Sequence, residues 1–351
     1  MARRNETRPV KVGNLIIGGQ NKVLIQSMCK HKTSDVDLII NEINECTSLG
    51  ADLMRVSVLD EQDALAIKKI KAGITIPLIA DIHFNQRLAI LAIESGADKI
   101  RLNPGNISDE KKIGEIVELA KKNNVAIRVG ANSGSIDKEI DKLNLPLAKK
   151  LVLSVKKQID ILERHHFNNI VISLKASDVK ETIDAYRLAA QEYSYPLHIG
   201  LTEAGLKDVA ISRSVAALSP LLLEGIGNTI RISITGDAKD EIIAAKRLLH
   251  DLNLYENYPT FISCPTCGRT QIDLKDIAEK VFRYLEDNNI KLTVAVMGCV
   301  VNGPGEAKNA DLGLAGGKGE CVIFKKGEII KKVPEAKAYD TLINEIKKMT
   351  L

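Results

Sequence analysis

Cysteines toward the end of the chain have the types and spacing of a soft-metal site. Cys264 and Cys267 form a C-x₂-C pair in SCPTCGRT, and Cys299 follows the apolar run LTVAVMG. Thiolates are ligands for zinc and for iron–sulfur centres. The turn-forming run NGPG then leads directly to Glu306. The pattern predicts a metal centre built from two loops, and a closed zinc site with Cys321 as its fourth ligand also fits it.

Positive side chains earlier in the chain predict a second site. In IRLN, Arg101 and Asn103 alternate with Ile100 and Leu102, and four further segments alternate in the same way. Successive side chains of a strand point to opposite faces, so the polar members share one face. The polar positions that we select as substrate-binding are Arg55, Arg101, Asn103, Arg128, Asn132, Lys175, Arg231 and Ser233.

The charge on this face is unbalanced. Five of these side chains are cationic, and the opposing acids are Asp81 and Glu203. Unpaired buried charge is costly, and guanidinium groups suit phosphate oxygens. We therefore expect a small phosphorylated or diphosphorylated substrate. Salt bridges at the closed end of a barrel are the structural alternative.

Candidate acids and bases follow the predicted strands. Asp81 and His83 lie in ADIHFN, and Glu203 follows Thr202 in GLTEAG. Carboxylates and imidazoles at such positions are suited to proton transfer. A lone carboxylate at a strand end is as often structural as catalytic.

The elements that position these residues alternate regularly. Eight β-rich segments, each followed by a stretch of helical periodicity, predict a (β/α)₈ TIM barrel over residues 1–255. A doubly wound sheet is disfavoured because no G-x-G-x-x-G follows the first strand. The eight segments are 23–28, 53–58, 78–83, 99–103, 126–130, 170–175, 197–202 and 229–235.

A cluster of Asn, Tyr and Pro in DLNLYENYPT predicts a linker after the barrel. Residues 256–351 then read as a small α+β domain. It contains a helix from Asp273, a strand from Leu292, two further strands and a final helix from Pro334.

Composition narrows the class of protein. The 351 residues carry 49 Lys and Arg against 45 Asp and Glu, a net charge of +4, with 7 Tyr, 5 Phe and no Trp. The chain has too few aromatic residues to form a surface that stacks nucleic-acid bases on aromatic rings. No apolar run approaches the roughly 18 residues of a membrane span, and the N-terminus has no secretory h-region. We expect a cytoplasmic globular protein, with no nucleic-acid or membrane partner.

The motifs together resemble a known family. The motifs, in chain order, are ADIHFN, IRLNPGN, IRVGANSGS, GIGNTIRISIT, SCPTCGRT and MGCVVNGPGEA. They are similar to the 4-hydroxy-3-methylbut-2-enyl diphosphate synthase family, iron–sulfur enzymes of the non-mevalonate (MEP) isoprenoid pathway.

The resemblance implies a cofactor and a reaction. A [4Fe-4S] cluster would be held by Cys264, Cys267, Cys299 and Glu306. The substrate would be 2-C-methyl-D-erythritol 2,4-cyclodiphosphate, with its diphosphate on the five cations of the barrel. Two electrons would open the ring and release water. Glu203, Asp81 and His83 would supply or orient protons, and Asn103 and Asn132 would hold substrate hydroxyls.

The resemblance also implies partners. Reduced flavodoxin or ferredoxin would supply electrons, and a head-to-tail homodimer would place one subunit's cluster domain over the other's barrel. The rival prediction is a barrel transferase for a phosphorylated or pterin substrate with a structural zinc domain. A cluster-bearing sensor or RNA-binding module would need a basic stripe with aromatics, which this composition does not offer.

Overall fold

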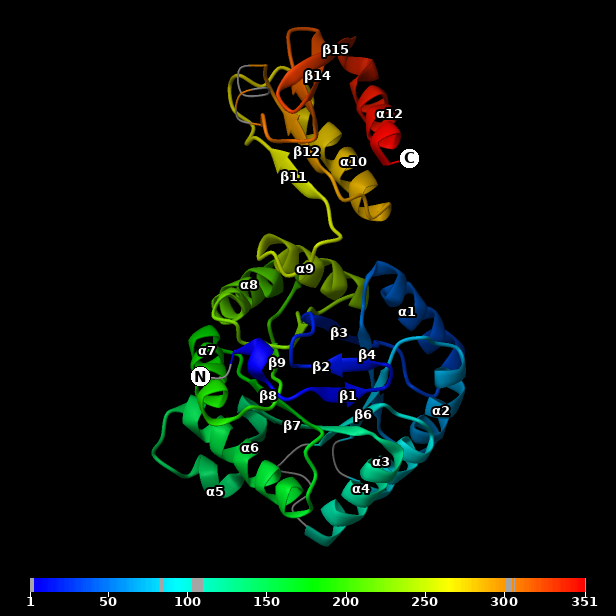
Figure 1. The fold of residues 1–351 in the computed structure, drawn as a ribbon, viewed down its shortest axis with the longest axis vertical. Coiled ribbons are helices and arrows are strands. Elements are labelled where there is room, and N and C mark those ends of the chain that lie inside the picture. Colours follow the sequence, from blue (N-terminus) through cyan, green and yellow to red (C-terminus); the bar gives the residue numbers. More distant parts are fainter. Residues whose placement is uncertain (1–2, 83–84, 103–109, 301–304, 306, 351) are drawn as a thin grey trace. The chain divides into compact units, whose positions relative to one another are not determined.

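The computed structural model describes residues 3–82, 85–102, 110–300, 305 and 307–350. It divides into two compact units between Leu254 and Tyr255 (Figure 1). Each unit has its own sheet and its own helices. No helix among the described residues is long and apolar enough to cross a membrane.

The first unit is a barrel of parallel strands, as the sequence predicts. The strand order is β8-β7-β6-β5-β4-β3-β10-β9, and one bridge between Ile172 and Leu197 joins the two ends. The strands are β3 (Leu24–Met28), β4 (Leu53–Val58), β5 (Leu78–Ile82), β6 (Lys99–Leu102), β7 (Ala126–Asn132), β8 (Ile170–Lys175), β9 (His198–Gly200) and β10 (Thr229–Arg231).

Two strands end earlier than the sequence predicts. The seventh was expected to reach residue 202 and the eighth residue 235, but they end at Gly200 and Arg231. Past the end of the eighth, the Ile234 N–H bonds to the Glu241 carboxylate. Past the end of the seventh, the Thr202 N–H still bonds to the Ala176 carbonyl, although the segment is no longer a strand there.

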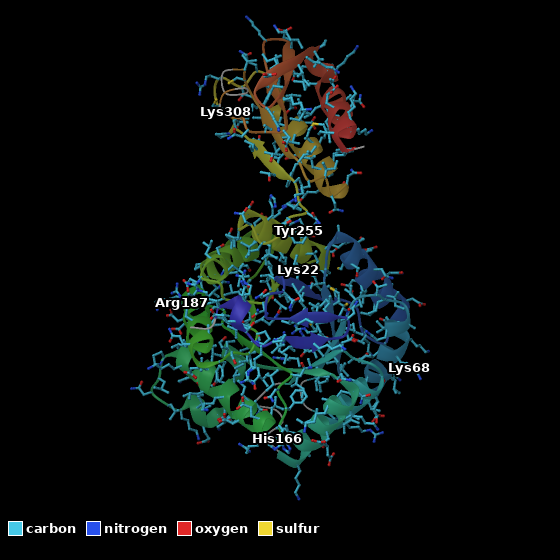
Figure 2. The ribbon with its side chains drawn as sticks, viewed as in Figure 1. Lys22, Lys68, His166, Arg187, Tyr255 and Lys308 are labelled. Carbon is cyan, nitrogen blue, oxygen red and sulfur yellow. The ribbon has the colours of Figure 1, made fainter. Side chains whose placement is uncertain are left out.

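Helices surround the barrel (Figure 1). Aspartates begin several of them: Asp60, Asp178 and Asp237 accept backbone N–H bonds in the first turn of the helices that they precede. Charged side chains such as Lys68 and Arg187 lie on these outer helices (Figure 2). The helices are α1 (Val36–Leu49), α2 (Glu61–Ala72), α3 (Gln86–Glu94), α4 (Glu110–Asn123), α5 (Lys138–Asp141), α6 (Leu147–Arg164), α7 (Val179–Glu192), α8 (Lys207–Leu223) and α9 (Ala238–Asp251), with short 3₁₀ turns at Arg4–Glu6 and Ser133–Ser135.

An N-terminal hairpin closes one end of the barrel. It consists of β1 (Val10–Val12) and β2 (Leu15–Ile17), paired antiparallel. Its buried side chains pack against residues near the starts of the barrel strands. The cluster comprises Val10, Val12, Ile17, Leu24, Leu53, Ile79, Ala126 and Val171. Polar residues further along the same strands therefore face the opposite, carboxyl end, where TIM-barrel sites lie.

The Tyr186 hydroxyl reinforces the seam of the barrel. Between β8 and β9 the structure has an isolated bridge instead of a ladder. Tyr186, buried on α7, accepts a bond from Leu174 N–H at 3.1 Å and donates to the His198 carbonyl at 2.8 Å. One side chain thus links the two strands.

Replacing Tyr186 with Phe should destabilise the barrel. Because both backbone groups at this buried link lose a partner, we expect the free energy of unfolding to fall by about 1–3 kcal/mol. Urea denaturation measures this change. Hydrogen exchange should quicken in β8 and β9 while β4 and β5 stay protected. An unchanged urea midpoint would contradict the assignment.

The second unit is a five-stranded sheet with helices on one face. Strands β11 to β13 are parallel, and β14 and β15 add antiparallel. Val294 and Val296 face the helices, whereas Ala295 and Met297 pack on the other side. The elements are β11 (Thr260–Ser263), α10 (Leu274–Asp287), β12 (Thr293–Met297), β13 (Leu312–Gly316), β14 (Glu320–Lys325), β15 (Glu328–Pro334), a 3₁₀ turn at Glu335–Lys337 and α12 (Ala338–Thr350).

Candidate active site

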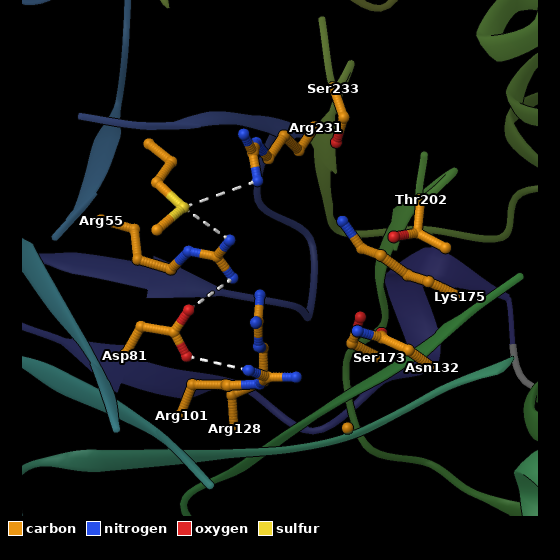
Figure 3. A pocket seen from close by; sticks show the side chains of 12 residues that line it. Arg55, Asp81, Arg101, Arg128, Asn132, Ser173, Lys175, Thr202, Arg231 and Ser233 are labelled. Atoms are coloured by element: carbon orange, nitrogen blue, oxygen red, sulfur yellow. Dashed lines mark hydrogen bonds and ion pairs between the residues drawn. The ribbon is translucent and has the colours of Figure 1, made fainter. Parts of the chain in front are cut away.

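A polar cavity of about 270 Å³ lies at the carboxyl ends of the barrel strands (Figure 3). Its walls include eight of the site residues predicted from the sequence: Arg55, Asp81, Arg101, Arg128, Asn132, Lys175, Arg231 and Ser233. Four further residues complete it: Met28, Gly130, Ser173 and Thr202. We refer to this cavity as the cationic pocket.

Strand register explains why these side chains meet. Asp81 lies opposite Arg101, and Arg101 lies opposite Arg128, so three neighbouring strands present charge at one level. A small residue makes room on the other side. A Cβ at Gly200 would stand 2.8 Å from Lys175 Nζ and 2.7 Å from the Arg231 carbonyl, so a larger residue would displace the lysine.

Asp81 is the counter-ion of two arginines. Its Oδ1 accepts from Arg101 Nη1 at 3.0 Å, and its Oδ2 lies 3.6 Å from Arg55 Nη1. All three side chains are buried. Two guanidiniums stabilise the ionised carboxylate, so this geometry favours holding the arginines in place over donating a proton.

Glu241 is a second counter-ion, which the sequence did not reveal. It lies on α9, is 1% exposed, and accepts bonds from Ser27 Oγ at 2.6 Å and Lys30 Nζ at 2.8 Å. Arg231 binds it through Nε and Nη2, both at 3.1 Å. Burial raises the pKa of Glu241, but the Arg231 and Lys30 charges outweigh burial and lower that pKa to about 2. Arg231 is thereby fixed at the wall of the pocket.

Positive charge remains in excess. Among the described residues, the Nε and Nη1 atoms of Arg128 have no hydrogen-bond partner, although the side chain is 2% exposed. Met28 Sδ, a weak acceptor, lies 2.9 Å from Arg55 Nη2 and 3.8 Å from Arg231 Nη1. Five cations therefore share two described carboxylates, which suits the pocket for a multiply charged anion.

Two matched substitutions test this charge imbalance. Arg128→Met removes a buried cation without a described partner, so we expect the ligand-free protein to gain about 1–3 kcal/mol of stability. Arg101→Met removes a partner of Asp81 and should lose stability by a similar amount. Urea denaturation of the two variants compares them directly. Destabilisation by Arg128→Met equal to that by Arg101→Met would show that Arg128 is already neutralised.

The cysteines of the second unit lie at one edge of its sheet. Ser263 pairs with Val296 across parallel β11 and β12, so Cys264 and Cys299 both follow the carboxyl ends of neighbouring strands. The Gly298 N–H donates to Cys264 Sγ at 3.2 Å. Hydrogen bonds from Arg269 hold the pKa of the exposed Cys267 thiol below its usual value. The two loops therefore place three thiols in one region.

Thiols are the donor type of soft-metal and iron–sulfur centres. Among the described residues, no three Cys, His, Asp or Glu side chains gather closely enough to hold one metal ion. In a four-iron cluster each ligand binds a different iron, so its thiolates stand further apart. Cys321 belongs to the buried apolar cluster under the helices, which favours a structural role for that thiol.

Not every predicted site residue is among those described. His83, Asn103 and Glu306 fall outside the described residues. Glu203 is described: it is exposed, does not line the pocket, and adopts a left-handed backbone with φ of 52°. Its neighbour Thr202 lines the cavity instead.

The fold and the pocket define a TIM barrel with a cationic pocket, joined to a thiol-bearing α+β domain. Residues 7–246 match the GcpE TIM-barrel domain, and residues 260–348 match the GcpE protein C-terminal domain. The chain belongs to the GcpE family.

Named relatives agree with this assignment. The chain is 49% identical over 346 residues to 4-hydroxy-3-methylbut-2-en-1-yl diphosphate synthase (flavodoxin) of Malacoplasma penetrans, covering 99% of this chain and 94% of that protein. It is 48% identical over 349 residues to the protein of the same name from Exiguobacterium sibiricum, covering 99% and 94%.

Solved structures share the barrel at low identity. Dihydropteroate synthase of Yersinia pestis superposes with a TM-score of 0.50 at 13% identity, over 70% of this chain and 98% of that one. The Vibrio fischeri enzyme gives 0.50 at 12%, with the same coverage. At this identity the similarity concerns the fold alone.

Proposed function

We propose that this protein converts 2-C-methyl-D-erythritol 2,4-cyclodiphosphate to 4-hydroxy-3-methylbut-2-enyl diphosphate. The relatives' names support the reaction, and the cationic pocket supports the substrate class. The observation that carries the proposal is Arg128, a buried guanidinium whose Nε and Nη1 have no described partner, in a pocket of five cations. A diphosphate supplies the missing negative charge.

Each cation then has a distinct role. Arg128 and Lys175 bind phosphate oxygens directly, because no described carboxylate forms an ion pair with either. Arg55, Arg101 and Arg231 are held in place by Asp81 and Glu241, so they bind without losing further side-chain freedom. Asn132 and Ser233 line the same wall and would bond to substrate hydroxyls, as would Asn103.

Reduction requires a redox centre, for which we propose a [4Fe-4S] cluster held by Cys264, Cys267, Cys299 and Glu306. When bound, the cluster supplies the two electrons one at a time. With two protons, these electrons open the ring at a C–O bond and release a hydroxyl as water. Glu203 and His83 are the candidate proton donors, and Asp81 orients Arg55 and Arg101. Reduced flavodoxin is the proposed electron donor, by analogy with the relatives' names.

Anaerobic purification tests the metal site. We expect about four irons and four sulfides per chain. Cys299→Ala should lose most of them together with conversion of the cyclodiphosphate by reduced flavodoxin. Cys46→Ala is the matched control, since that thiol is buried in the barrel. Stoichiometric zinc that survives Glu306→Ala would instead support the transferase with a zinc domain.

We further propose that the two sites meet in a head-to-tail homodimer. If one subunit's cysteine domain serves its partner's barrel, Cys299→Ala and Arg128→Met chains should complement each other. Mixed and reassembled subunits should regain up to about a quarter of the unsubstituted activity, since half of the dimers are mixed and each of these has one intact site. A mixture as inactive as its components would contradict capping between subunits.

A further inference from the structure

A second polar layer lies beneath the cationic pocket. Lys99 precedes Arg101 by two residues on β6, Thr229 precedes Arg231 on β10, and Gln26 precedes Met28 on β3. Side chains two apart on a strand share a face, so these residues form the next layer toward the closed end. His198 on β9 pairs with Thr229, its Nδ1 lying 2.7 Å from Oγ1.

Lys99 has an unusual environment for an amine. Its side chain is fully buried, and its Nζ donates to the neutral Gln26 Oε1 at 3.3 Å. Arg128 and Arg55 are the charged groups that face it, and His198 shares the layer. No described carboxylate forms an ion pair with Lys99.

Lys175 is in a related position one layer higher. It is buried, lines the pocket, and is faced by Arg231, Arg128 and Arg55, with Glu241 as the opposing charge. Burial lowers the pKa of Lys99 and of Lys175 well below the usual lysine value, and the neighbouring guanidiniums lower both further. The imidazole pKa of His198 is lowered for the same reasons, burial first.

These groups differ in how they respond to crowding of positive charge. Arginine does not lose its proton in proteins, whereas a buried lysine readily does. In the empty pocket, the lysines are therefore the groups that relieve the repulsion. A bound dianion would offset the charge of Arg55, Arg128 and Arg231, and the ammonium form would become favourable again.

We propose that binding of the diphosphate is coupled to uptake of protons by Lys99 and Lys175. The inference rests on the proposed substrate. The empty pocket would carry less positive charge than a count with both lysines protonated gives. It would gain the missing charge only as the ligand enters. Affinity should then fall as pH rises, by up to about tenfold per pH unit for each proton taken up.

Calorimetry of the holoenzyme without reductant tests this coupling. The ligand is the cyclodiphosphate, whose phosphates each carry one strongly acidic group, so the ligand neither gains nor loses protons near neutral pH. Binding heats are measured in buffers with different heats of ionisation, and their slope gives the protons taken up. We expect net uptake in the unsubstituted protein, and a smaller uptake in both Lys99→Met and Lys175→Met.

Lys30→Met is the matched control. Lys30 lies near the same pocket, but it is a third exposed and its charge is paired with Glu241. It should leave the proton count unchanged. Should Lys99→Met fail to fold, ¹³Cε signals of labelled lysines in the unsubstituted protein report the same event, as a shift toward the ammonium form on ligand addition.

The outcomes separate this inference from the proposed function. Binding without proton uptake, or uptake that persists in both lysine variants, overturns the coupling and leaves the substrate assignment standing. Loss of uptake in His198→Asn alone also overturns it, since the proton would then go to the imidazole. Failure of the cyclodiphosphate to bind at all overturns both proposals.

Discussion

Positive charge confined inside a barrel is the constraint on which the rest of this structure depends. Five cations from five strands meet in a small cavity and are offset by only two described carboxylates. Such an arrangement lowers stability, because buried charge loses its hydration. The surroundings must stabilise the barrel enough to tolerate it. The apolar cluster under the N-terminal hairpin and the Tyr186 link across the seam both add to that stability.

The side chains inside the barrel change from apolar to neutral polar to pocket-lining in steps of two residues along a strand. Leu24, Gln26 and Met28 on β3 pass from the apolar floor through the polar layer to the pocket wall. The strand period places each type in its own layer. The cations are therefore separated from the apolar floor by groups, such as Gln26 and Thr229, that can form hydrogen bonds without carrying charge. This gradation lets one set of short strands both anchor the barrel and bind an anion.

The features that follow from the two-residue alternation of the strands could be predicted from the sequence. A site residue that lies on a helix could not. The barrel and the lumen-facing positions of Arg55, Arg128 and Lys175 follow from local alternation. Glu241 could not be found this way, because it sits on a helix whose pattern reads as ordinary amphipathicity. Asp81 was found, but its pairing with two arginines depends on strand register. The ends of the seventh and eighth strands were placed too late, because the alternation of polar and apolar residues continues past Gly200 and Arg231, where the strands stop.

The thiols of the second unit, like the pocket residues of the barrel, lie at the carboxyl ends of parallel strands. Cys264 and Cys299 follow neighbouring parallel strands, as the pocket residues do in the barrel, so both units present their chemistry at carboxyl edges. The two kinds of chemistry need different surroundings. Guanidiniums bind hard phosphate oxygens and gain strength from burial, whereas thiolates need soft metal and access for an electron donor. In a single cavity, the same lining residues would have to provide both the burial that the guanidiniums need and the access that the thiolates need. Two compact units allow the barrel to keep its charge buried while Cys267 stays exposed.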